Sequence, residues 1–475
     1  MNAPPTVLRV AADDLGDRFV LSADTLRSPH AGSLDDVRAW LAERAVADRP
    51  SIRRIPIDSL TEWSRDPDTG DLVHRSGAFF RLRGLRVHGA AGPVPTWTQP
   101  IIHQPEIGIL GILARQIDGV LCLLMQAKME PGNINGIQLS PTVQATRSNY
   151  RRMHGGAATR YLEHFTEPGH GRVLVDVLQS EQGSMSHQKR NRNMIVEVDG
   201  DVPIDDTHRW VTLGQVRRLL AEPNVVNMNA RSVLSNLPLT SRSFAGRAGG
   251  TPFADALAES LADRSGVIEL QNWFNTVKCD AGLRAELVPL RGISDWDDRD
   301  GQIAHAEDRF FSVLGVSVGD SQREVTSWTQ PLIAPRGQGV VAFLVSRAHG
   351  RLEVLLQAKI EAGARDIAEI APTVQAIPDS YKCVPADQHP AYLNLVEKAR
   401  PEAIRFDALQ SEEGGRFYHA EHRYVIVEVD ADVRDAPTPP GYRWARPGQL
   451  LELLRHSGYL NIEARSLLSC LHTLW

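Results

Sequence analysis

The sequence is poor in cysteine and has no long hydrophobic run. The wide spacing of its four cysteines excludes CxxC metal-thiolate sites and a disulfide scaffold. The longest apolar stretches, such as residues 119–125, are too short to span a bilayer. Residues 1–20 contain no basic segment followed by an apolar one, as a secretory signal would. We therefore expect a reduced, cytoplasmic protein with no membrane association. The cysteines are Cys122, Cys279, Cys383 and Cys470.

Several common catalytic motifs are also missing. The sequence has no GxxxxGK[ST], no GxGxxG after a strand, no HExxH and no GxSxG. His419 and His422 stand close together, but they have no third neighbour with metal-ligand spacing. The net charge of −6 leaves no domain-wide basic excess that could neutralise phosphates. We therefore expect no metal, no serine nucleophile and no nucleic-acid partner.

What the sequence does contain is an internal repeat. The string TWTQPII at 96–102 returns as SWTQPLI at 327–333, so Trp97 and Trp328 are 231 positions apart. LLMQAK and VLLQAK, LSPTVQAT and IAPTVQAI, and VLQSEQG and ALQSEEG keep the same offset. After one three-residue insertion, NMNARSVLSNL at 227–237 matches NIEARSLLSCL at 461–471. The sequence therefore predicts two copies of one domain.

The repeats set the expected domain boundaries. Residues 33–240 form the first copy, 241–255 a Gly- and Ser-rich linker, and 256–475 the second copy. Residues 1–32 have no visible counterpart and are interpreted as an N-terminal arm. Each copy has a helix, a series of short strands and a final helix, which predicts an α/β (α+β) layer fold with a mixed sheet. Ser33 is the expected N-cap of the first helix.

Polar residues alternate along three of the expected strands, so they share one face of each strand. Such a face is often only the solvated side of an antiparallel sheet. Amide-rich strands are an unusual choice for that purpose, however, and the pattern recurs in the second copy. We therefore predict a pocket on this face. The first-copy residues are Gln126, Lys128, Glu130, Thr142, Gln144, Gln179 and Glu181, and the second-copy residues are Gln357, Lys359, Gln375, Gln410 and Glu412.

Basic residues divide the two copies. The first has Lys128, Arg147, Lys189 and Arg190 near these strands, whereas Pro378 replaces Arg147 in the second. Arg and Lys side chains are what a diphosphate needs. The segment KRNRN is equally well explained as a solvated loop. The first copy is nevertheless the better candidate for a phosphorylated ligand.

Long strings in both copies resemble the NDP-hexose 2,3-dehydratases of deoxysugar biosynthesis. In the first copy these are LLMQAKMEPGNINGIQLSPTVQATRSNY, DVLQSEQGSMSHQKRNRNMIVEV and VNMNARSVLSNL. The resemblance covers roughly residues 35–475. It implies two tandem Nudix-like domains and a homodimer. The sequence departs from Nudix hydrolases themselves, because neither copy contains their glutamate-rich metal-binding string.

The resemblance also implies a reaction. The substrate would be dTDP-4-keto-6-deoxy-D-glucose, which loses a proton from C3 and its hydroxyl from C2, giving a dTDP-3,4-diketo-2,6-dideoxyhexose. The oxidation at C3 is internal, so we expect no cofactor. A downstream NADPH-dependent 3-ketoreductase would consume the product on the way to an antibiotic sugar. The alternatives are a nucleotide-sugar hydrolase with an unfamiliar metal site and a non-catalytic nucleotide-sugar carrier.

Roles for individual residues follow only from this resemblance. Glu181 or Glu130 would be the base, His187 or Tyr150 would protonate the departing hydroxyl, and Lys128 would stabilise the enolate. Trp97 or Trp210 would stack on thymine, although each is more often a core residue. Arg231 and Arg465 would either bind the ligand or tie the last helix to the sheet. The diphosphate contacts would be Arg147, Lys189, Arg190 and Arg231, and the second-copy pocket would add Tyr381, His419 and Arg465.

Overall fold

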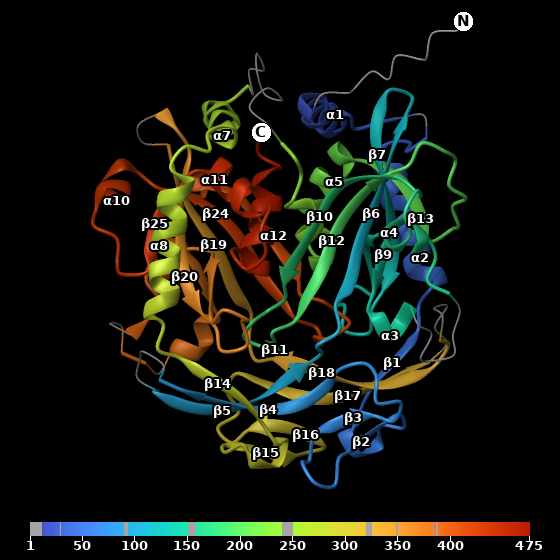
Figure 1. Ribbon diagram of the computed structural model, residues 1–475, viewed down its shortest axis with the longest axis vertical. Helices are drawn as coiled ribbons and strands as arrows, with labels where there is room; N and C mark the ends of the chain where they lie inside the picture. Colours follow the sequence, from blue (N-terminus) through green and yellow to red (C-terminus); the bar gives the residue numbers. More distant parts are fainter. Residues whose placement is uncertain are drawn as a thin grey trace, which may run out of the picture.

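The computed structural model describes residues 12–28, 30–89, 94–150, 158–239, 250–319, 325–347, 350–382, 384–385 and 388–475. Two seven-stranded mixed sheets stand side by side, one in each repeat (Figure 1). Their strand orders are equivalent, with one parallel pair in each, β12 on β6 and β24 on β19. This identity of topology confirms the duplication. The first sheet contains β6 (Gly108–Ile117), β7 (Val120–Met129), β8 (Ile137–Pro141), β9 (Val143–Ala145), β10 (Arg172–Ser180), β12 (Arg190–Glu197) and β13 (His208–Thr212). The second contains β19 (Gly339–Ser346), β20 (Glu353–Ile360), β21 (Ala368–Ala371), β22 (Val374–Ala376), β23 (Ile404–Ser411), β24 (Glu421–Glu428) and β25 (Tyr442–Ala445).

Two buried helices lie between these sheets and join the repeats. α6 (Met228–Leu234) and α12 (Ile462–Leu471) pack against each other, and every residue of both is buried. One hydrophobic cluster runs from Met125 through both helices to Phe343, so the two repeats share one core. The other helices are α1 (Ala12–Asp24), α2 (Leu34–Ala47), α3 (Arg147–Tyr150), α4 (Glu163–Thr166), α5 (Leu213–Leu220), α7 (Pro252–Ala262), α8 (Val267–Asp280), α9 (Leu393–Glu397), α10 (Ala431–Asp435) and α11 (Pro447–Leu453).

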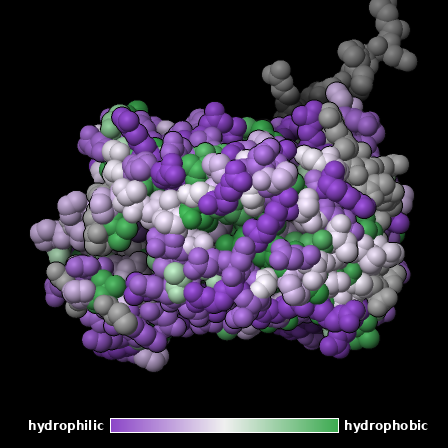
Figure 2. All heavy atoms as spheres, turned by 90° about the horizontal axis from the view of Figure 1, so that it is seen from below, coloured by the Kyte–Doolittle hydropathy of each residue, from purple (hydrophilic) through white to green (hydrophobic). Residues whose placement is uncertain are grey.

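Below the mixed sheets, two further sheets exchange one strand each. β1 of the first repeat pairs with β17, and β14 of the second repeat pairs with β4. The two sheets share a core cluster that includes Trp63 and Trp296. Seen from below, the outward face is mainly hydrophilic with scattered hydrophobic residues (Figure 2). The strands are β1 (Ser51–Ile55), β2 (Trp63–Arg65), β3 (Leu72–His74), β4 (Arg81–His88), β5 (Thr96–His103), β11 (Ser186–His187), β14 (Arg284–Val288), β15 (Trp296–Arg299), β16 (Gln302–His305), β17 (Phe311–Gly319) and β18 (Trp328–Pro335).

The N-terminal segment differs from the expected arm. α1 packs on α5 just as α7 packs on α11, so it does have a counterpart in the second repeat. Phe19 is fully buried in the shared core. Ser22 accepts a hydrogen bond from Leu213 N and donates one to Leu121 O. The sequences of α1 and α7 have diverged too far for the relation to be visible.

The helix start at Ser33 is confirmed, because Ser33 and Asp36 form a capping box. α7 begins at Pro252 with Thr251 as its N-cap, inside the segment expected to be linker. Residues 241–249 of that expected linker lie outside the described residues. No helix within the described ranges is long and apolar enough to cross a bilayer.

Candidate active site

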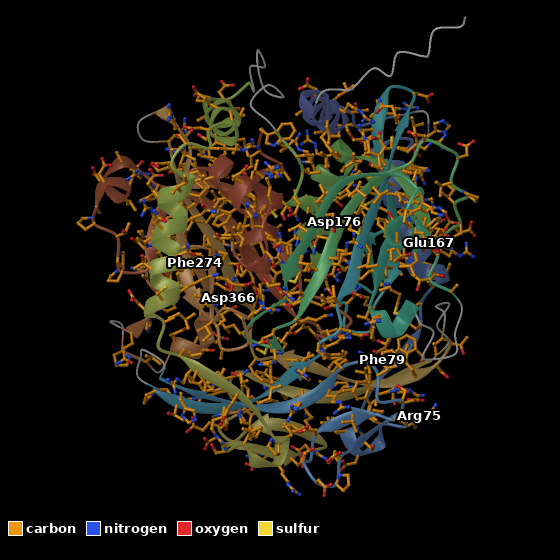
Figure 3. All side chains as sticks on the ribbon, in the orientation of Figure 1. Arg75, Phe79, Glu167, Asp176, Phe274 and Asp366 are labelled. Carbon is orange, nitrogen blue, oxygen red and sulfur yellow. The ribbon has the colours of Figure 1, made fainter. Side chains whose placement is uncertain are left out.

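A cavity of about 380 Å³ lies where the first mixed sheet meets the lower sheets. Lys128, Glu130, Gln144, Glu181 and Lys189, all predicted from the sequence, line it together. Arg75 and Phe79, on the segment between β3 and β4, line it from below (Figure 3). This volume is typical of a small-molecule pocket.

Glu181 and Lys189 form the most strongly perturbed pair in this cavity. The Glu181 side chain is 5% exposed; its Oε1 accepts from Asn191 Nδ2 at 2.5 Å, and its Oε2 has no hydrogen-bond partner among the described residues. Burial, together with the charge of Glu413, raises the pKa of Glu181 to about 7. Burial lowers the pKa of Lys189, whose Nζ donates to Glu106 O at 2.6 Å, to about 8. Each group can therefore hold or release a proton near neutral pH.

A second polar group surrounds Gln144 on β9. Its Nε2 donates to Glu130 Oε1 at 2.7 Å, and its Oε1 accepts from Asn227 Nδ2 at 3.1 Å. The Nζ of Lys128 lies 3.5 Å from the carbonyl oxygen of Gln144. This network fixes Glu130 and Lys128 at the cavity wall, which is the condition for precise contacts with a ligand.

The second repeat completes the cavity. Trp328 on β18 lines it, with its Nε1 donating to Gln330 Oε1 at 2.8 Å. Arg416 donates to Gln104 Oε1 at 2.9 Å, and its guanidinium lies 4.6 Å from the centre of the Phe80 ring. Sequence reasoning placed the aromatic candidate at Trp97, whereas its counterpart Trp328 is the one beside the first-copy residues. The repeat offset relates Trp97 to Trp328, but the sequence does not show that β18 of the second repeat lies at the first-copy cavity.

Close backbone contacts hold the contributing loops in place. Gly132 N donates to Gly414 O at 2.8 Å, and in the reciprocal contact Gly363 N donates to Gly183 O at 2.8 Å. A Cβ added at Gly132 would lie 1.7 Å from Phe417 O. Only glycine permits this approach, so the glycine explains how the 414–417 loop reaches the first-copy cavity.

Three residues predicted to contact the ligand are buried structural groups outside the cavity. Thr142 accepts from Leu113 N at 2.9 Å and donates to Leu124 O. Gln179 donates to Leu454 O at 3.0 Å, which joins the two repeats. Arg231 is fully buried and donates to Val226 O and to Ser411 O, so it ties α6 to the sheets. Polar residues on the strand faces therefore stabilise the fold at some positions and line the cavity at others.

The remaining residues predicted for the first-copy site do not line this cavity, as far as the described residues show. His187 faces His103 with ring centroids 5.5 Å apart, outside the cavity. Trp97 packs with a cluster that includes Leu85, and Trp210 is a core residue. Gln126 is half-buried on β7 beyond the cavity lining, Arg147 is exposed next to the lining residue Thr146, and Arg190 lines a different cavity. The side chain of Tyr150 lies outside the described residues.

The second copy retains the Lys-Glu-Gln group but not its surroundings. Lys359 pairs with Glu361 at 3.0 Å, and Gln375 donates to Glu361 at 3.4 Å. Ala420 stands where the first copy has Lys189. The other predicted residues have separate environments: Gln357 is half-buried, Tyr381 lies near His389, Gln410 donates to Leu220 O, Glu412 accepts from Gln182, His419 is exposed and stacked on Tyr418, and Arg465 donates to Ser180 O.

Across the described residues, no three His, Cys, Asp or Glu side chains are arranged as a metal site.

Comparison with known proteins identifies the family to which the chain belongs. The family model for NDP-hexose 2,3-dehydratase matches residues 34–237 and again 268–471. A dTDP-4-dehydro-6-deoxy-alpha-D-glucopyranose 2,3-dehydratase of Saccharopolyspora spinosa is 49% identical over 445 residues, covering 93% of this chain and 91% of that protein. A protein of the same name from Amycolatopsis orientalis is 46% identical over 468 residues, covering 97% and 94%. The chain belongs to the NDP-hexose 2,3-dehydratase family.

Proposed function

We propose that the protein removes the C2 hydroxyl of dTDP-4-keto-6-deoxy-D-glucose as water. The family match and the names of both relatives support this substrate. The observation that carries the chemistry is Glu181, a buried carboxyl whose Oε2 has no partner among the described residues and which lines the cavity beside Lys189. Such a group suits proton transfer at a carbon acidified by a neighbouring ketone.

The reaction consists of proton transfers and one elimination. A base takes the C3 proton, and the electron pair forms an enolate with the C4 ketone. The enolate re-forms the ketone, creates a C2–C3 double bond and expels the C2 hydroxyl, which takes a proton and leaves as water. The resulting C3 enol then loses its hydroxyl proton while C2 gains one, which gives the 3,4-diketo sugar. Substrate and product plus water balance without an external oxidant.

We assign Glu181 as the base and Lys189 as the donor to the departing hydroxyl. The perturbed pKa values of the two groups support a proton exchange at neutral pH. Lys128, beside Glu130, supplies positive charge for the enolate oxygen. His187 lies outside the cavity, so it is a weaker donor than Lys189. Tyr150 remains the other candidate donor.

The nucleotide would occupy the part of the cavity that the second repeat builds. Trp328 offers an aromatic face for the base. Arg75 and Arg416 line the same cavity and offer guanidinium groups for the diphosphate. The working site is thus assigned to the first copy, with the second copy supplying part of its wall.

We further infer the setting of the enzyme from its family and its product. Each repeat would be Nudix-like, and the protein would act as a cytoplasmic homodimer. The diketo product has a reactive C3 ketone, so an NADPH-dependent 3-ketoreductase would consume it in antibiotic deoxysugar biosynthesis.

The test is to incubate the purified protein with the substrate and EDTA in deuterated water, trapping the product with a 3-ketoreductase and NADPH. We expect a C2-deoxygenated sugar with deuterium at C2. Release of dTMP or dTDP would favour the hydrolase alternative, and unchanged substrate would favour the carrier. Dehydrated product without deuterium at C2 would exclude the enol step.

A further inference from the structure

A second cavity, of about 200 Å³, lies between the repeats on the other side of Glu181. Glu181 and Lys189 line both cavities. The second repeat contributes Glu369 and Arg365 to this wall, together with Asp366, which is labelled in Figure 3. Arg365 and Asp366 are exposed, so this cavity reaches the surface. The proposed base therefore lies in the wall between the two cavities.

Glu369 on β21 is an unusual residue for this wall. Its side chain is 3% exposed, and its Oε2 has no hydrogen-bond partner among the described residues. Burial raises the pKa of this carboxyl to about 8, while a hydrogen bond to the Ser180 side chain opposes the shift. A buried carboxyl with an unused oxygen is costly to fold, which calls for an explanation beyond packing.

The first repeat provides an internal comparison, because its equivalent positions are 231 residues earlier. Gln138 stands there in place of Glu369, and Asn135 in place of Asp366. Gln138 Nε2 donates to Asn135 Oδ1 at 3.1 Å, and Asn135 Nδ2 donates to Asn224 O at 2.8 Å. Neutral amide side chains can therefore form the hydrogen bonds that the fold needs at this position. The carboxyl of Glu369 is not required by the architecture.

The reaction supplies a reason for an opening here. Substrate in the first cavity would cover the face of Glu181 that points into it, and so block that route to solvent. The base must nevertheless lose the proton it has taken from C3 before the next turnover. A second cavity that is open to water would give this proton another route to solvent.

We propose that the second cavity is the solvent port of the reaction site, with Glu369 relaying the proton of Glu181 to bulk water. This inference rests on the proposed function. One proton moves from C3 to Glu181, then through water in the cavity to Glu369, and finally to solvent. Glu369 acts only through Glu181 and does not touch the substrate.

The experiment follows the label of a substrate carrying deuterium at C3, in ordinary water, with the product trapped at once by a 3-ketoreductase and NADPH. In the unmodified protein we expect the label to be lost to water. In Glu369→Gln the deuteron stays on Glu181 longer, so the fraction returned to C2 should rise several-fold. Glutamine already occupies the equivalent position in the first repeat, which favours folding of this variant. Glu369→Asp, which keeps a carboxyl, should lose the label, and so should the control Asp366→Asn at the rim.

A second variant tests the proposal independently, in case Glu369→Gln does not fold. Ser457 is exposed and lines the cavity, so Ser457→Trp should narrow the port without disturbing the core and should also raise label return to C2. Unchanged label loss in folded Glu369→Gln and Ser457→Trp would overturn the relay. Failure of the unmodified protein to dehydrate the substrate at all would instead overturn the proposed function.

Discussion

Arg231 and Arg465 make the same contact from opposite repeats. Arg231 donates to the carbonyl oxygen of Ser411 at 2.7 Å, and Arg465 donates to that of Ser180. Both guanidinium groups are fully buried. The two repeats are therefore joined by a reciprocal pair of charged hydrogen bonds inside the shared core.

Removing either arginine should destabilise the whole molecule. We expect Arg231→Met or Arg465→Met to lower the free energy of unfolding by about 2–4 kcal/mol, because buried carbonyl oxygens lose their donor. Urea denaturation followed by circular dichroism measures this. The exposed Arg455→Met is the matched control and should change stability by less than about 0.5 kcal/mol. Equal stability of the buried and exposed variants would show that the ties contribute little.

Paired substitutions test which copy is catalytic. Lys128→Ala and Gln144→Ala should each lower kcat by about 100-fold or more, because the first removes the positive charge proposed for the enolate oxygen and the second disturbs the network that holds it. Lys359→Ala and Gln375→Ala, at the equivalent positions, should lower it by less than about tenfold. Steady-state kinetics of the folded variants would measure kcat and show which copy is catalytic. Loss of turnover confined to the second-copy variants would reverse the assignment.

The two repeat-related tryptophans should differ in substrate binding. Trp328→Ala should raise KM by about tenfold, equivalent to about 1.4 kcal/mol, because a stacking surface of the cavity is lost. Trp97→Ala should leave KM near its original value, since Trp97 lies outside this cavity. Trp328→Phe should restore most of the affinity. A KM effect in Trp97→Ala alone would place the nucleotide elsewhere.

The pH dependence of turnover should reflect Glu181 and Lys189. A base must be deprotonated, so kcat/KM should fall about tenfold per pH unit below pH 7. A donor must be protonated, so kcat/KM should fall again above pH 8. Lys189→Met should remove the alkaline limb together with most of the activity. A profile that is flat from pH 5 to 9 would be incompatible with both roles.

Glu369 should make stability depend on pH in a defined window. Its folded-state pKa, about 8, lies above the ordinary value of 4.5, so the folded protein holds this proton more tightly than the unfolded chain does. The resulting stabilisation is complete below pH 4.5, declines as the pH rises, and is lost above pH 8. Glutamine does not titrate, so the Tm of Glu369→Gln relative to the unmodified protein should increase between pH 5 and pH 8.5. Differential scanning calorimetry would contradict this if the difference in Tm stayed constant.

The sequence predicted the duplication and the mixed sheets because short-range patterns encode them. Alternating polar residues placed Glu130, Gln144 and Glu181 at one cavity. The same alternation cannot distinguish a residue that lines the cavity from one that only stabilises the fold, which is why it also predicted Thr142 and Gln179 as site residues. The sequence did not predict Trp328 as a contact of the first-copy site, because contacts between elements far apart in the chain have no local signature.

The exchange of β1 and β14 also constrains how the chain is made. On the β14 side, residues 84–88 of β4 have no partner until Arg284–Val288 has left the ribosome, and β1 must wait longer still, for Phe311–Gly319. The amino-terminal half therefore cannot complete its fold until part of the second half has been made, and a chain stopped near residue 250 would expose an open strand edge that favours aggregation. Although the halves derive from one ancestral unit, a lower sheet of each is now completed by a strand of the other.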